Sequence, residues 1–182
     1  MQLTQKERLY LQDAAEHEKL CIAKYNDYSS QVSCPQLASL LQQIAQSEQQ
    51  HLQTIQQVMQ GQMPNLASSG SQSMGQGGQS MGMSGGQGQG GVSMQAGGQM
   101  GANKPTMSTA GTGQMQQGLS DKEICQDLIT TEKAIAGMYN TATFEASNHQ
   151  LRQVLSHIQQ EEQDHAFQIF NYMQQKGWYQ PQ

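Results

Sequence analysis

Two Glu-x-x-His motifs carry the residues of this 182-residue sequence that are best suited to bind metal ions. Glu48 precedes His51 by three positions, and Glu162 precedes His165 by the same interval. Residues three apart project from one face of a helix, so each motif can offer a carboxylate and an imidazole to one ion. A further glutamate lies 30 residues before each motif, and the complete set is Glu18, Glu48, His51, Glu132, Glu162 and His165.

The four glutamates lie among apolar residues at helical spacing, so we expect all of them to point inward. Buried carboxylates repel one another and are costly to desolvate unless they are protonated or bound to cations. Two divalent ions, iron or manganese, would neutralise four carboxylates, and two imidazoles would complete the coordination. We predict a dinuclear site in which Glu48 and Glu162 bridge the ions, Glu18 and Glu132 bind terminally and each histidine caps one ion. The alternative is a polar core inherited from a metal-binding ancestor.

Other polar residues are weaker candidates. Tyr25 and Tyr139 lie two turns beyond the inward glutamates. We interpret both as core aromatics that need a hydrogen-bond partner, and contact with the ligands or one-electron chemistry is the alternative. We expect His17 to lie on the surface and His149 and His157 to be structural or solvated. We expect Glu16 and Glu161 to be solvated, because the residues aligned with them in the repeat described below are not acidic.

The positions of these residues follow from an internal duplication. Sliding the chain by 114 positions aligns residues 13–60 with residues 127–174 without a gap, and 17 of the 48 pairs are identical. All six candidate ligands and both tyrosines fall on identical pairs. The folded part is therefore a repeated unit.

Each unit is predicted to contain two helices. The first should run from about Thr4 to Ser30, with Ile22 on its apolar face, and the second should begin at Pro35 and stop at Gly61. Helical starts are also indicated at Ser120, with Glu123 completing a capping box, and at Asn148. The fourth helix should end before Gly177.

Two amphipathic hairpins can bury their apolar faces against each other, which predicts an all-α four-helix bundle. A long connection between the second and third helices is typical of ferritin-like bundles, so we expect a bundle of that kind. The half-bundles are residues 1–60 and 119–182. Residues 61–118 contain 17 of the 19 glycines, one charge and no aromatic residue, so we expect a disordered linker. Such a chain spans about 40 Å, enough to cross a bundle of helices about 39 Å long.

Composition excludes several classes of protein. The net charge is −5 without a basic stripe, which makes nucleic acid an improbable partner. There is no apolar run long enough to span a membrane and no visible secretory signal, so synthesis in the cytoplasm is the default expectation. Three cysteines without paired spacing predict buried or half-buried thiols, not a zinc ribbon or a disulfide framework.

Residues Leu119 to Tyr179, and especially the terminal MQQKGWY, resemble the spore coat protein F (CotF-like) family, with the N-terminal hairpin as a divergent copy. The resemblance implies a mainly structural, ferritin-like domain of the spore coat, made in the mother-cell cytoplasm. It also implies other coat proteins, or further copies of the chain, as partners.

The ligand set also resembles rubrerythrins and manganese catalases, which act on peroxide. However, Ile135 stands where the rubrerythrin pattern has a further glutamate, and no CxxC pair provides an electron relay. The alternative function is therefore a di-manganese or di-iron oxidoreductase of the catalase type. The sequence leaves open whether the protein is an enzyme.

Overall fold

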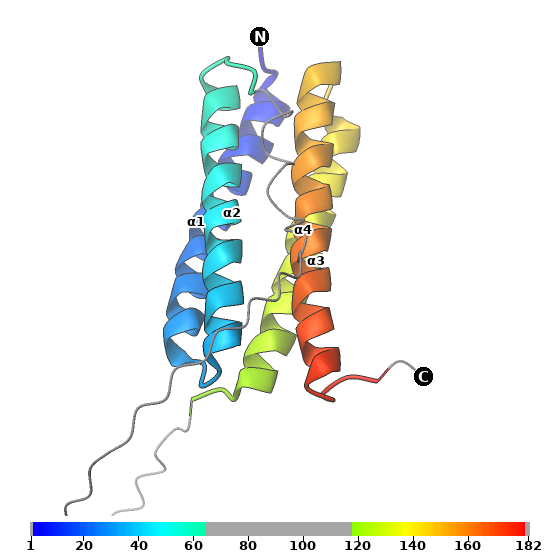
Figure 1. Ribbon diagram of the computed structural model, residues 1–182. Helices are drawn as coiled ribbons and strands as arrows, with labels where there is room; N and C mark the ends of the chain where they lie inside the picture. The colour runs from blue at the N-terminus through cyan, green and yellow to red at the C-terminus, as the bar shows by residue number, and fades with distance from the viewer. Residues whose placement is uncertain (1, 65–117, 181–182) are drawn as a thin grey trace, which may run out of the picture. The chain divides into compact units, whose positions relative to one another are not determined.

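The computed structural model describes residues 2–64 and 118–180, and this part of the chain folds into four long helices. Helix α1 spans Gln5–Gln31, α2 spans Pro35–Met59, α3 spans Asp121–Glu145 and α4 spans His149–Gln175 (Figure 1). The described residues contain no strand, so the predicted all-α class with two helical hairpins is confirmed. The disordered linker predicted for residues 61–118 lies, from residue 65 to residue 117, outside the described residues.

The helices begin at the predicted residue types. Pro35 occupies the first position of α2, where its missing N–H costs no hydrogen bond. Ser120 and Glu123 form the predicted capping box of α3, in which the Glu123 carboxylate accepts the Ser120 backbone N–H at 2.8 Å. The Asn148 side chain accepts two backbone N–H groups at the start of α4. A second capping box, at Thr4 and Glu7, begins α1.

Glycines follow the ends of α2 and α4. Gly61 has φ 82° and Gly177 has φ 69°, a left-handed conformation that side chains with a Cβ rarely adopt. Both predicted stops are therefore confirmed, and each turn is closed by backbone hydrogen bonds to the last helical turn.

The two hairpins run in opposite directions beside each other. Lys6, at the start of α1, pairs with Glu145 at the end of α3, and Ser33, just after α1, contacts Asp121 at the start of α3. Because α1 and α3 are thus antiparallel, α2 ends at one end of the bundle and α3 begins at the other (Figure 1).

Reciprocal carboxylate contacts join the hairpins at their loops. Glu7 of α1 accepts the backbone N–H of Ser147 at 2.7 Å and its hydroxyl at 2.9 Å. Asp121 of α3 accepts the backbone N–H and the hydroxyl of Ser33, both at 2.9 Å. These pairs are related by the 114-residue duplication, so each hairpin stabilises the loop of the other.

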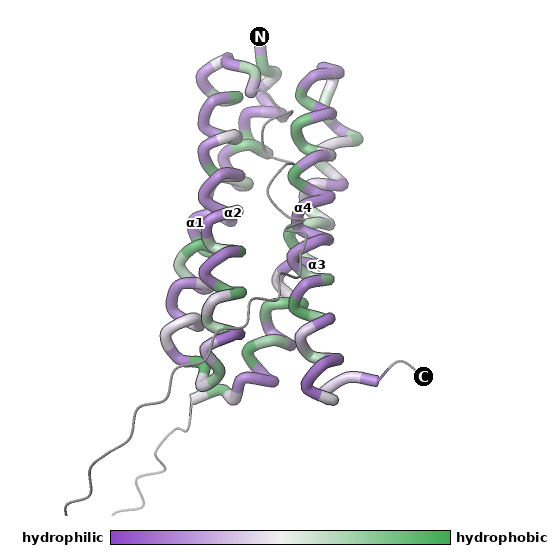
Figure 2. The backbone as a smooth tube through the Cα atoms, viewed as in Figure 1, coloured by the Kyte–Doolittle hydropathy of each residue, from purple (hydrophilic) through white to green (hydrophobic). Residues whose placement is uncertain are grey.

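Apolar positions recur along all four helices among hydrophilic ones (Figure 2). The predicted apolar faces of α2, α3 and α4 are buried throughout. On α1, Ile22 is only half-buried, and Cys21 is buried in its place. Cys125 is buried and Cys34 half-buried, so the expected environment of the three thiols is confirmed.

None of the described helices combines the length and the apolar character needed to span a bilayer.

Candidate metal centre

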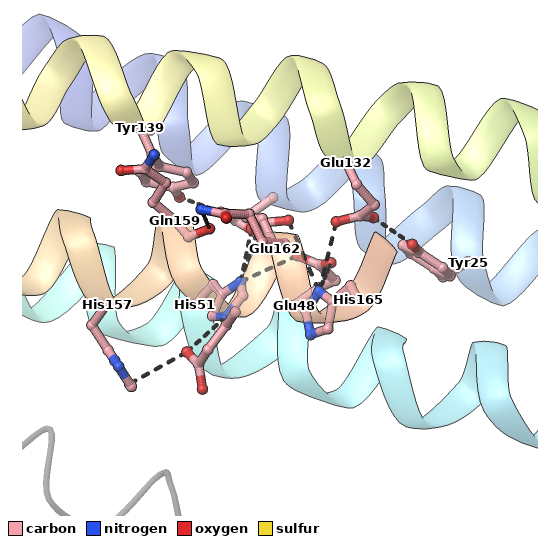
Figure 3. Close-up of polar contacts among 12 residues, drawn as sticks. Tyr25, Glu48, His51, Glu132, Tyr139, His157, Gln159, Glu162 and His165 are labelled. Carbon is pink, nitrogen blue, oxygen red and sulfur yellow. Dashed lines mark hydrogen bonds and ion pairs between the residues drawn. The ribbon is translucent and has the colours of Figure 1, made fainter. Parts of the chain in front are cut away.

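Each helix brings one glutamate to the middle of the bundle. Glu18 comes from α1 and Glu132 from α3. Helices α2 and α4 each contribute a glutamate and a histidine one helical turn apart, namely Glu48 with His51 and Glu162 with His165 (Figure 3). All six side chains are buried, and none is more than 4 % exposed. The inward orientation predicted from the periodicity is confirmed for the four glutamates.

The ligand atoms form two overlapping groups of four. In each group, one ligand atom from every residue lies within 4.8 Å of the others; the groups are Glu18, Glu48, His51 and Glu162, and Glu48, Glu132, Glu162 and His165. Two glutamates, Glu48 and Glu162, belong to both groups. These two carboxylates are therefore close enough to serve two neighbouring ions.

Both imidazoles present Nδ1 to the carboxylates. His51 Nδ1 lies 3.1 Å from Glu162 and 3.3 Å from Glu48, and His165 Nδ1 lies 3.0 Å from Glu48. The two ring centroids are 5.5 Å apart. The duplication thus appears in space as a local pseudo-twofold arrangement, in which each histidine reaches the glutamate of the opposite motif.

The two tyrosines contact the terminal glutamates across the hairpins. The Tyr25 hydroxyl donates to Glu132, and the Tyr139 hydroxyl donates to Glu18. Both tyrosines are therefore core aromatics with a hydrogen-bond partner, as we favoured from the sequence. That partner is a candidate metal ligand, which was part of the alternative. Each tyrosine orients a carboxylate that a metal ion could bind.

Burial and the neighbouring imidazoles shift the pKa values of the four carboxyl groups in opposite directions. Burial raises the pKa of Glu18 and of Glu132 to about 8. Burial also acts on Glu48 and Glu162, but the neighbouring imidazoles outweigh it and lower the pKa of both groups.

Burial opposes the charged form of the imidazoles too, yet the surrounding carboxylates raise the pKa of His51 and His165 well above its ordinary value. The imidazoles thus favour the charged form of Glu48 and Glu162, whereas burial favours the protonated form of Glu18 and Glu132.

The hydrogen bonding of this cluster is incomplete. Five of its carboxylate oxygens and one imidazole nitrogen are buried without a hydrogen-bond partner: Glu18 Oε2, Glu48 Oε1, Glu132 Oε2, both oxygens of Glu162, and His165 Nδ1. Several of these atoms lie at ion-pair distances, but without the geometry of a hydrogen bond. Buried polar atoms normally have partners. Buried carboxylate oxygens that converge without hydrogen-bond partners fit a pair of cations, and an oxygen-rich set with two imidazoles suits iron or manganese.

One contact was not predicted. Glu161, expected to be solvated because the duplication pairs it with Ser47, is about one-quarter exposed and accepts a hydrogen bond from His51 Nε2 at 3.0 Å. His157 Nε2 lies 3.4 Å from the same carboxylate oxygen. The spacing of four between His157 and Glu161 was a usable signal, since it places both on one helical face. The prediction that His17, His149 and Glu16 are exposed is confirmed.

A comparison with known families finds a match for the second hairpin. Residues 120–182 match the Coat F domain. The Coat F segment comprises α3 and α4, and it supplies Glu132, Glu162 and His165. No curated protein and no solved structure matches the chain.

Proposed function

We propose that the protein is a spore coat component whose helical bundle holds a dinuclear metal centre. The Coat F match over residues 120–182 supports the coat assignment. The first hairpin contributes Glu18, Glu48 and His51 through the same duplicated positions, so both halves of the chain build one ferritin-like unit. Its role in the coat is mainly structural, and its partners are other coat proteins or further copies of the chain.

The observation that carries the metal proposal is the pair of overlapping ligand groups with unpartnered oxygens. Glu48 and Glu162, which belong to both groups, would be shared by the two ions. Glu18 and His51 would complete one position, and Glu132 and His165 would complete the other. When bound, iron or manganese would supply a redox-active pair and would neutralise the buried carboxylates.

The protein's own residues prepare this site. Tyr25 and Tyr139 hold the terminal carboxylates through hydroxyl donors, which limits the rotation of Glu132 and Glu18. The apolar faces of all four helices surround the cluster, so that its six side chains are buried. The ligands are thereby pre-organised by packing and by hydrogen bonds to residues around them.

Metal analysis tests the proposal. We expect protein purified from cells supplemented with iron or manganese to contain two ions per chain, as measured by elemental analysis. The Glu48→Gln and Glu162→Gln variants should each lose most of this metal, whereas the exposed control Glu16→Gln should retain it. Folded protein that binds no metal in either supplement would contradict the proposal.

Location is tested separately. A fluorescent fusion expressed in a spore-forming bacterium should be made in the mother cell and should then surround the developing spore. A fusion that stays diffuse while the coat assembles would contradict the coat assignment and leave the metal proposal intact.

A groove beside the centre favours a second candidate function, the catalase-like conversion of peroxide. The groove lies between α3 and α4, has a volume of about 410 Å³, and includes Glu132 and Glu162 in its lining. Small residues, Ala136 and Ala166, also line it. The corresponding residues of the first hairpin are the larger Ile22 and Leu52. A small molecule could therefore approach the centre more readily from the Coat F segment.

Peroxide turnover tests this second function. We expect oxygen release from hydrogen peroxide by the metal-loaded protein, measured with an oxygen electrode. Ala136→Ile and Ala166→Leu, which copy the first hairpin, should each lower the rate without changing the metal content, because the larger side chains fill the groove. The exposed Ala134→Leu is the matched control. A metal-loaded protein without turnover would contradict this function and retain the structural one.

A further inference from the structure

The two candidate histidine ligands differ at the ring nitrogen that faces away from the glutamates. His51 Nε2 contacts the Glu161 carboxylate at 3.0 Å. All three carboxylate contacts of His165 are made through Nδ1, and within residues 2–64 and 118–180 its Nε2 contacts no carboxylate. The pseudo-twofold arrangement therefore includes the six candidate ligands but not the residue that contacts Nε2 of His51.

The two histidines differ at Nε2 because the hairpins have different residues at two positions. The duplication pairs Glu161 with Ser47 and His157 with Gln43, so the first hairpin has neither the carboxylate nor the histidine beside it. In the second hairpin, His157 lies one turn before Glu161 and contacts the same oxygen that accepts from His51. Glu161 is thus held on both sides, and it acts on the histidine of the other hairpin.

A carboxylate that accepts one imidazole N–H affects the other nitrogen. It fixes the tautomer with the proton on Nε2, sets the orientation of the ring and makes Nδ1 a stronger donor to a metal ion. For His51, Nδ1 is the nitrogen that faces Glu18, Glu48 and Glu162. His165 has the same ligand surroundings without such a carboxylate.

We propose that the two ion positions of the centre are inequivalent, with the ion at His51 and Glu18 held more tightly than the ion at His165 and Glu132. Glu161 is the positioning residue that creates the difference. This inference rests on the proposed dinuclear centre. Loss of a carboxylate behind a histidine ligand typically costs about 10–100-fold in metal affinity, which sets the expected difference.

The duplication provides a matched pair of variants for the test. His165→Gln leaves the position beside His51, and His51→Gln leaves the position beside His165, with Glu48 and Glu162 present in both. Titration calorimetry with Mn²⁺ should give a dissociation constant about 10–100-fold lower for His165→Gln than for His51→Gln. Circular dichroism establishes that both variants are folded.

A second substitution in each variant isolates Glu161. Glu161→Gln should weaken Mn²⁺ binding about 10–100-fold when combined with His165→Gln and leave it unchanged when combined with His51→Gln. Ser47→Glu, which gives the first hairpin the missing carboxylate, should strengthen binding in His51→Gln. The exposed Glu16→Gln is the control for a change in charge alone.

The outcomes separate the inference from the proposed function. If wild-type protein binds neither Mn²⁺ nor Fe²⁺, both are wrong. If it binds Mn²⁺ but the two single-position variants have equal affinity, or if Glu161→Gln weakens both of them equally, the centre stands and the inference is overturned. Tighter Mn²⁺ binding by His51→Gln after the added Ser47→Glu would support the role of the carboxylate. A residue with a merely structural role would not raise the metal affinity when it is introduced in the other hairpin.

Discussion

The two hairpins contain the same candidate ligands but surround them differently. Glu18, Glu48 and His51 of the first hairpin correspond one by one to the ligands of the second. Beside them, Ser47 and Leu52 of the first hairpin correspond to Glu161 and Ala166 of the second. The comparison shows that residues making the same inward contacts have stayed alike, whereas their neighbours now give one hairpin a carboxylate and a groove.

The largest expected effects test whether the hairpins contribute equally to the core. Leu37 and Leu151 are paired by the duplication, and both are at most 1 % exposed. Leu37→Ala and Leu151→Ala should each lower the free energy of unfolding by about 2–5 kcal/mol, because each leaves a cavity. Urea denaturation followed by circular dichroism measures both.

Leu9→Ala is the control for that pair, since Leu9 is 55 % exposed and its loss should change stability by about 0.5 kcal/mol or less. Costs that differ by more than about 2 kcal/mol between the two core variants would contradict an evenly shared core.

Smaller effects are expected from the two tyrosine hydroxyls. Tyr25→Phe and Tyr139→Phe each remove the donor to a buried glutamate and leave the aromatic ring in place. We expect a loss of about 1–3 kcal/mol for each, because a buried oxygen is left without its partner. Thermal unfolding of the metal-free protein checks this. No loss in either variant would indicate that the hydroxyls do not support the carboxylates.

The two carboxylates that hold the loops of the hairpins differ in their burial. Glu7 is buried, whereas its counterpart Asp121 is half-buried. Glu7→Gln should lower the free energy of unfolding by about 1–2 kcal/mol at neutral pH, because it weakens charge-assisted hydrogen bonds from Ser147 and Thr4. Asp121→Asn should lower it by less. Chemical denaturation of both variants measures the difference, and equal losses would contradict the role assigned to burial.

The contribution of Glu7 should also depend on pH. Burial raises the pKa of Glu7, but hydrogen bonds from Thr4 and Ser147 outweigh it and lower the pKa from 4.5 to about 2. Because the folded state binds the proton more weakly, the stabilisation is complete above pH 4.5 and is lost as the pH falls to about 2. The stability difference between wild type and Glu7→Gln should shrink over this range, and a constant difference would refute the assignment.

Much of the fold could be predicted because its signals are local. Ser120 with Glu123, Pro35 and the two stop glycines determine where helices begin and end through contacts within a few residues. The inward positions of Glu48 and Glu162 follow from the helical period. Ile22 packs against the core as predicted but is only half-buried, because the burial of a position at the edge of an apolar face depends on the neighbouring helix.

Four helices, their duplication and the six residues that converge in the core follow from local patterns, because periodicity and spacing decide which side chains share a helical face. The folded structure was needed to find that Tyr25 reaches Glu132, that Glu7 holds the loop at Ser147 and that Glu161 contacts His51. These contacts join residues at least 107 positions apart. They depend on how one hairpin is aligned along the other, which the pattern within a single helix does not specify.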